Sequence, residues 1–366
     1  MTEIIKAKDD AALLALIPQL TGYTASESLI CVFFSGKRTQ GALRVDLPRR
    51  RRLADYKTIT SNIAASLNRL PHVDGVAIAI YTNASFEAEK GIPFFDFHRH
   101  VTSKLADAGF AIKASLCVAA DGWGSYFDRD CPQTGRPLAE VTPSVEVEHI
   151  DRWNTLPDCA AEDQRTFELE LREFGESNRA SRSNRELDDV ELIELIASRQ
   201  GDLPRELDIE LIWMTQLPSL RDLISLQTAF GKIVGEAVWE QNEEYLQIQQ
   251  STGLTMDEVV RRELSAGRVD LDDEFTSLLM GKGRIRPDVQ RTELMIARLQ
   301  RLIALSPQAF RPGPLCVLAY LLWALGLSKA AQIYVMMALE IDPNYGMAHI
   351  QFAILDHGML PEWAYG

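Results

Sequence analysis

The sequence is poor in cysteine and histidine, and it lacks the spacings that hold structural metals. Its 366 residues include 5 cysteines and 6 histidines. The cysteines are odd in number and form no C-x-x-C pair, and the histidines form no H-E-x-x-H motif. This pattern argues against a disulfide framework, a zinc ribbon and a zinc protease. We therefore expect a reducing compartment, no metal and no cofactor.

Long apolar runs are also missing. The longest, Pro314 to Leu327, is too short to cross a bilayer and is typical of a buried helix. The first twenty residues mix charges with a short amphipathic stretch and lack the features of a signal peptide. We expect a cytoplasmic protein with no membrane attachment.

Positive charge is in deficit. Lys and Arg total 38 against 52 Asp and Glu, which gives a formal net charge of −14. Because so acidic a surface repels phosphate backbones, the charge argues against nucleic-acid binding. The 46% of hydrophobic and 25% of charged residues are typical of globular proteins, and the length is sufficient for two domains.

The common nucleotide and hydrolase motifs are missing as well. The stretch "FFSGKRTQG", Phe33–Gly41, lacks the G-x-x-x-x-G-K-[ST] pattern and is followed by a strand pattern where a phosphate loop needs a helix. The sequence contains no dinucleotide-binding fingerprint, no kinase motif set and no G-x-S-x-G elbow. We expect no tightly bound nucleotide.

The first 145 residues predict an α/β domain. Strand patterns alternate with amphipathic helices in the order β-β-α-β-α-β, and two strands joined by a short glycine-bounded segment suggest a hairpin. Strand–helix–strand steps favour parallel neighbours, so the sheet should be mixed. The expected strands are 28–36, 41–48, 75–83 and 111–122, and the expected helices are 55–70 and 94–110.

Residues 160–366 predict an all-α domain, because amphipathic helical patterns follow one another there without a strand pattern. A hydrophilic stretch, 175–189, predicts an exposed loop between helices. Between about residues 312 and 345, the small, apolar and turn residues have the spacing of one 34-residue tetratricopeptide repeat. Since a single repeat cannot bury its own faces, this hairpin should pack on the preceding helices and form no solenoid.

Several motifs resemble one known family. They are "LIPQLTGYTASESLICVFF", "LRVDLP", "DGWGSYFDRDCPQTGRPL", "SLRDLI", "RPDVQRTELMIARLQRLIAL" and the repeat-like C-terminal segment. In this order they resemble the actinobacterial family called domain of unknown function 4192. The chain departs from the family at Gly22–Tyr23, Ala25 and Asp130–Cys131, where the family tends to carry Gly–Phe, a Pro and two adjacent Cys. The resemblance implies no activity.

The loop Asp121–Leu138 is the first candidate site. Asp121, Asp128 and Asp130 offer carboxylates to a divalent cation. Ser125 and Cys131 are candidate nucleophiles. The loop nevertheless lacks the fixed spacing of a calcium loop. The alternative is that Trp123 and Tyr126, its bulky aromatic residues, anchor an extended loop or hairpin whose prolines shape its turns.

Two further groups are weaker candidates. The adjacent Arg49, Arg50, Arg51 and Arg52 follow a strand pattern and suggest either binding of an anionic ligand or nucleic acid, or a solvated loop that begins a helix. His98 and His100 form H-x-H within a predicted helix. Residues two apart on a helix point to nearly opposite sides, so we predict no metal there.

Two functional classes remain open. Helical repeats present concave surfaces to peptides, so we expect a non-catalytic protein-binding or regulatory protein that engages another protein through its helical domain. The alternative is a hydrolase-type or metal-dependent enzyme that uses the loop Asp121–Leu138 at the end of the sheet. A deep pocket holding several Asp side chains would favour the enzyme, and a shallow, loop-covered sheet end would favour the binding protein.

Overall fold

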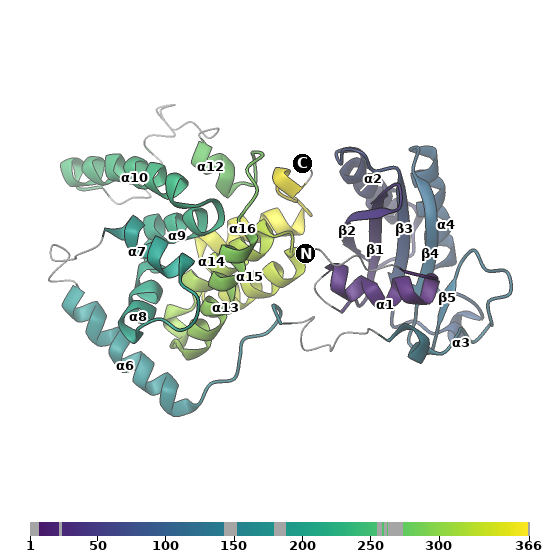
Figure 1. The fold of residues 1–366 in the computed structure, drawn as a ribbon, viewed down its shortest axis with the longest axis horizontal. Coiled ribbons are helices and arrows are strands. Elements are labelled where there is room, and N and C mark those ends of the chain that lie inside the picture. The colour runs from purple at the N-terminus through teal and green to yellow at the C-terminus, as the bar shows by residue number, and fades with distance from the viewer. Residues whose placement is uncertain are drawn as a thin grey trace. The chain divides into compact units, whose positions relative to one another are not determined.

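The computed structural model describes residues 7–21, 24–142, 152–178, 188–254, 258–259, 262 and 274–364. The chain divides into two compact units, 1–152 and 153–364, each with its own buried core residues. Figure 1 shows the first as a sheet with helices and the second as a group of helices. We call them the α/β unit and the helical unit.

The α/β unit is built on a mixed sheet, as the sequence predicts. Its strand order is β2-β1-β3-β4-β5. β1 pairs antiparallel with β2 and with β3, β3 pairs parallel with β4, and β4 pairs antiparallel with β5. The bounds are β1 (Ser28–Ser35), β2 (Arg38–Asp46), β3 (Gly75–Tyr81), β4 (Ala111–Val118) and β5 (Trp123–Ser125).

β5 lies within the predicted loop Asp121–Leu138. This segment is a strand because Trp123 pairs with Val118 of β4 on one side and bridges to Arg136 on the other. Three paired residues are too few to produce a strand pattern in the sequence.

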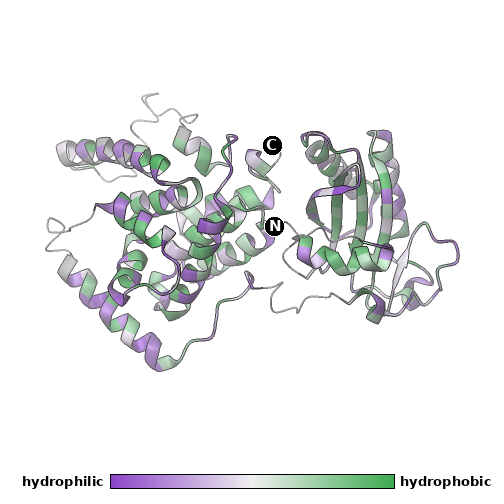
Figure 2. Cartoon of the chain, viewed as in Figure 1, coloured by the Kyte–Doolittle hydropathy of each residue, from purple (hydrophilic) through white to green (hydrophobic). Residues whose placement is uncertain are grey.

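Helices cover both faces of the sheet. Cores on opposite faces hold alternate residues of β1, with Ile30 and Val32 in one and Leu29 and Cys31 in the other, as the period of a strand requires. α1 packs on the first face, and α2 and α4 pack on the second. Figure 2 shows the central strands mostly green and the long loop beside β5 mostly purple. The helix bounds are α1 (Asp10–Thr21), α2 (Leu53–Asn68), α3 (Phe86–Glu89), α4 (Phe95–Asp107) and the 3-10 turn η1 (Leu138–Val141).

The helical unit contains no strand among its described residues. α6 runs to Asn178 and so occupies the start of the predicted loop 175–189, and residues 179–187 lie outside the described part. The bounds are α6 (Ala161–Asn178), α7 (Asp189–Ser198), α8 (Arg205–Met214), α9 (Pro218–Phe230), α10 (Lys232–Thr252), α12 (Glu274–Leu279), α13 (Val289–Leu305), η3 (Gln308–Phe310), α14 (Pro312–Ala324), α15 (Ser328–Ile341), α16 (Gly346–Asp356) and η4 (Glu362–Ala364).

α14 is the central helix of this unit. Every one of its 13 residues is buried, and it contacts α9, α13, α15 and α16. α14 and α15 occupy the predicted repeat-like hairpin, and Gly326 between them has a φ of +82°, which favours glycine. The likeness to a tetratricopeptide repeat stays a prediction.

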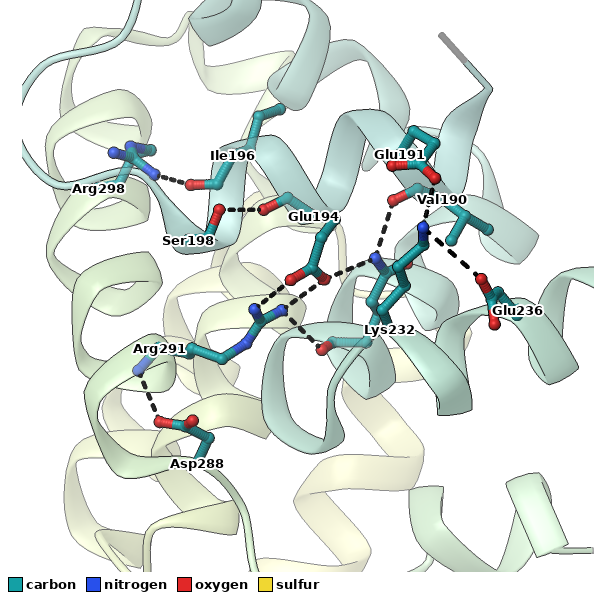
Figure 3. Close-up of polar contacts among 11 residues, drawn as sticks. Val190, Glu191, Glu194, Ile196, Ser198, Lys232, Glu236, Asp288, Arg291 and Arg298 are labelled. Atoms are coloured by element: carbon teal, nitrogen blue, oxygen red, sulfur yellow. Dashed lines mark hydrogen bonds and ion pairs between the residues drawn. The ribbon is translucent and has the colours of Figure 1, made fainter.

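Ion pairs and hydrogen bonds join α7 to its neighbours (Figure 3). Arg291 of α13 donates two hydrogen bonds to the carboxylate of Glu194, at 2.6 and 3.0 Å. Gln227 of α9 donates to the Val190 carbonyl at 2.8 Å. Lys232 at the start of α10 pairs with Glu191. These contacts fix α7 against three helices that are distant in sequence.

Candidate functional site

Asp121, the first predicted site residue, caps a helix. Its carboxylate accepts hydrogen bonds from the backbone N–H groups of Phe86 at 2.8 Å and Glu87 at 3.1 Å, at the start of α3. Burial raises the pKa of Asp121, but these backbone donors more than offset it and leave the pKa below its ordinary value. The side chain connects the end of β4 to α3.

The other predicted site residues of the loop are paired, hydrogen-bonded or at least partly buried. Asp128 forms an ion pair with Arg136 and accepts a hydrogen bond from the backbone of Asp130 at 2.9 Å. Ser125 is buried, with 5% of its surface exposed. Burial raises the pKa of the Cys131 thiol, which keeps it protonated and a poor nucleophile. These contacts favour the structural interpretation of the loop.

The four adjacent arginines are exposed and do not share a site. Arg51 pairs with Glu89 at 2.7 Å, and its guanidinium lies 4.3 Å from the centre of the Phe94 ring. Arg52 occupies the N-cap position of α2. Arg49 and Arg50 precede it in the connection from β2. Among the described residues of the unit, Arg51 is the one of the four with a side-chain contact outside this connection.

His98 and His100 both lie on α4, as the sequence predicts. His98 is buried; its Nδ1 lies 2.7 Å from the Ser115 hydroxyl, and its ring stacks on Tyr126 with centroids 4.0 Å apart. Burial lowers the pKa of His98 to about 4. Within the described ranges, no group of three or more His, Cys, Asp or Glu side chains is placed to hold a metal ion.

We expect acid to destabilise the α/β unit through His98. The folded state holds this residue neutral down to a pKa of about 4, whereas an unfolded histidine titrates near its ordinary 6.5. Between these values the unfolded state binds more protons, so stability falls as pH decreases from 6.5 to 4. The loss should reach about 2–3 kcal/mol. Hydrogen exchange of β4 and α4 peptides between pH 7 and 4 measures it.

A non-titrating variant isolates the effect. His98→Asn should flatten the pH dependence of β4 and α4 protection in this range. His72→Asn, which changes an exposed histidine of the same unit, should keep the wild-type dependence. An unchanged pH dependence in His98→Asn would show that another group is responsible.

The clearest candidate binding site lies in the helical unit. A partly open cavity of about 350 Å³ is lined by residues of α9, α12, α14 and α16, and we call it the α14 cavity. Its walls are mostly aliphatic and aromatic. The lining residues are Arg221, Asp222, Ser225, Thr276, Leu279, Met280, Cys316, Val317, Ala319, Tyr320, Trp323, Met347, Ile350, Gln351, Ile354 and Leu355.

One ion pair lies in the wall of this cavity. Arg221 donates from Nε to Asp222 Oδ1 at 3.2 Å and from Nη1 to the Tyr345 hydroxyl at 3.2 Å. Burial raises the pKa of Asp222, and the adjacent guanidinium opposes this rise. The pair therefore adds no net charge to a site that is otherwise mostly apolar.

The polar ends of the large aromatic residues point to backbone acceptors. The Tyr320 hydroxyl donates to the Leu278 carbonyl at 3.0 Å, and the Trp323 indole donates to the Met359 carbonyl at 2.8 Å. Burial raises the pKa of the Cys316 thiol to about 12, so this cysteine is not an activated nucleophile. The α14 cavity is suited to binding.

Sequence reasoning did not find this site. Its lining comes from four helices that span residues 221 to 355, and their spacing along the chain gives no indication that they enclose one cavity. One local signal was present. Arg221 and Asp222 interrupt the apolar pattern of α9, and a charged pair at a buried and a half-buried position of a helix indicates a specific role.

The fold and cavity define a class: a chain with a mixed-sheet α/β unit and a helical unit that contains a partly open, mostly apolar cavity. The family model described as Domain of unknown function (DUF4192) matches residues 11–151 and 246–362, so this chain belongs to that family. No curated protein and no solved structure matches the chain. Within the described residues, every helix is too short or too polar to cross a membrane.

Proposed function

We propose that this chain is a non-catalytic binding protein whose helical unit holds a small, mostly apolar molecule in the α14 cavity. The observation that carries the proposal is the cavity itself, about 350 Å³ lined mainly by aliphatic and aromatic side chains. Ligand sites in proteins are typically concave, largely apolar and about 300–1,000 Å³ in volume, with a few polar groups that orient the ligand.

The rigidity of the walls supports the same proposal. α14 is buried along its whole length, and Gly281 lies so close to Trp323 that an added Cβ would come within 2.3 Å of the ring. Because the ring is held between a glycine and the Met359 carbonyl, this wall is formed before a ligand enters.

The enzyme alternative has less support. The carboxylates of Asp121 and Asp128 bond to neighbouring groups in the α/β unit, and the thiols of Cys131 and Cys316 are held protonated by burial. Binding of a protein partner by the helical unit stays a prediction. Isolation of the tagged chain from its native cells, followed by mass spectrometry, tests that prediction.

A fluorescent apolar probe tests the proposed function. We expect N-phenyl-1-naphthylamine, which brightens in apolar surroundings, to bind the full chain with saturation at one site. Ala319→Leu adds bulk to the buried cavity wall and should weaken binding about tenfold or more, since overpacking competes with the ligand. Fluorescence titration gives both affinities.

Two further variants make the result interpretable. Met336→Leu changes an exposed residue of α15 outside the cavity lining and should leave the affinity unchanged. Ile350→Trp enlarges a lining residue that is 52% exposed, so it should weaken binding without overpacking the buried core. Absence of saturable binding, or equal affinity in both blocking variants and the wild type, would refute the proposal.

A further inference from the structure

The charges in the α14 cavity are already balanced. Arg221 and Asp222 are the charged residues of its lining, and they pair with each other at 3.2 Å. Arg221 also donates a hydrogen bond to the Tyr345 hydroxyl, so the orientation of its guanidinium is fixed. A charged ligand would enter an apolar site without a free counter-charge, and that desolvation is unfavourable.

Gln351 leaves one hydrogen-bonding position unfilled. Its amide nitrogen donates to the Cys316 carbonyl at 2.9 Å, which fixes the side chain against α14. Its Oε1 is buried and has no hydrogen-bond partner among the residues that the structure describes. A buried acceptor without a donor is unfavourable and uncommon in native proteins, so it indicates a group that a ligand satisfies.

Three other polar groups of the lining have internal partners. The Ser225 hydroxyl donates to the Arg221 carbonyl at 2.9 Å, and Tyr320 and Trp323 donate to backbone carbonyls as described above. Since their N–H and O–H groups are used, the Gln351 carbonyl is the clear unfilled position and requires a donor.

We propose that the molecule bound in the α14 cavity is uncharged, with an apolar body and one N–H or O–H group that donates to Gln351. This inference rests on the proposed function and specifies its ligand class. An alcohol, an amide or a secondary arylamine fits the description, and a fatty acid anion or a quaternary amine does not.

Three probes with one aromatic skeleton test the ligand class. N-phenyl-1-naphthylamine is neutral and has one N–H. Its N-methyl derivative lacks that donor, and 8-anilino-1-naphthalenesulfonate keeps the N–H but adds a negative charge. We expect the N-methyl and sulfonate probes to bind the wild-type chain about tenfold more weakly, the first for the lost hydrogen bond and the second for the uncompensated charge.

Gln351→Met separates the hydrogen bond from shape. Methionine has similar length and no carbonyl, so the difference between the N–H and N-methyl probes should disappear in this variant. A thermal melt checks that the variant is folded. If the N–H probe binds but the N-methyl or sulfonate probe binds equally well, the ligand class is wrong and the proposed function stands. If no probe binds, the proposed function itself fails.

Discussion

Replacing Trp123 by Ala is expected to lower the stability of the α/β unit by about 3–5 kcal/mol, the cost of truncating a buried aromatic residue. Its ring is 5% exposed and packs in the core formed with Leu14 and Ile17 of α1. The indole also donates to Glu140 at 3.2 Å, and the Arg136 guanidinium lies 5.3 Å from the ring centre. The variant removes all of these contacts.

A loop variant of similar chemistry provides the control. Phe127 lies in the same loop and is 54% exposed, so Phe127→Ala should remain within about 0.5 kcal/mol of the wild type. Chemical denaturation followed by hydrogen exchange of β1 and β3 peptides reports on the α/β unit alone. Equal protection in Trp123→Ala and the wild type would show that the loop is not anchored by this residue.

The loop is anchored on both faces of the sheet, which the sequence indicated only in part. Trp123 packs with α1, whereas Tyr126 belongs to the opposite core and donates its hydroxyl to the Pro93 carbonyl. The aromatic character of the two residues predicted anchors. That they lie on opposite faces depends on the pairing of β5 with β4, which three residues cannot specify from sequence.

The sheet was predictable because burial on both faces leaves a continuous apolar pattern. β1 and β3, the central strands, are buried along most of their length, and helices separate β3 from β4. The α14 cavity was not predictable in the same way. It depends on which sides of α9, α12, α14 and α16 face one another, and α14 is apolar all round, so its sequence does not indicate which of its sides lines a cavity.

The net charge is unevenly distributed between the two units. Lys and Arg balance Asp and Glu in residues 1–152, so the whole net charge of −14 belongs to the helical unit. The electrostatic argument against nucleic acid therefore applies to the helical unit, and the α/β unit is electrically neutral. An acidic helical unit is also consistent with an uncharged ligand, which that field neither attracts nor repels.

Arg298 should be as important to the helical unit as Trp123 is to the α/β unit. This residue of α13 is 7% exposed, and its guanidinium donates to the carbonyls of Ile196, Arg199 and Gly201. Figure 3 shows it beside the end of α7. The last carbonyls of a helix have no partner within the helix, so Arg298 supplies the donors that the end of α7 lacks.

Arg298→Met should therefore destabilise the helical unit by about 3–5 kcal/mol, because it leaves three buried or partly buried carbonyls without a donor. Arg298→Lys should recover part of this loss, since an ammonium group keeps the charge but cannot reproduce the planar guanidinium geometry. Arg199→Met makes the same change of charge at an exposed side chain and should remain near the wild type. Chemical denaturation monitored by hydrogen exchange of α7 and α13 distinguishes the three. If Arg298→Met and Arg199→Met unfold at the same denaturant concentration, the guanidinium contributes only its charge, and the proposed cap of α7 is wrong.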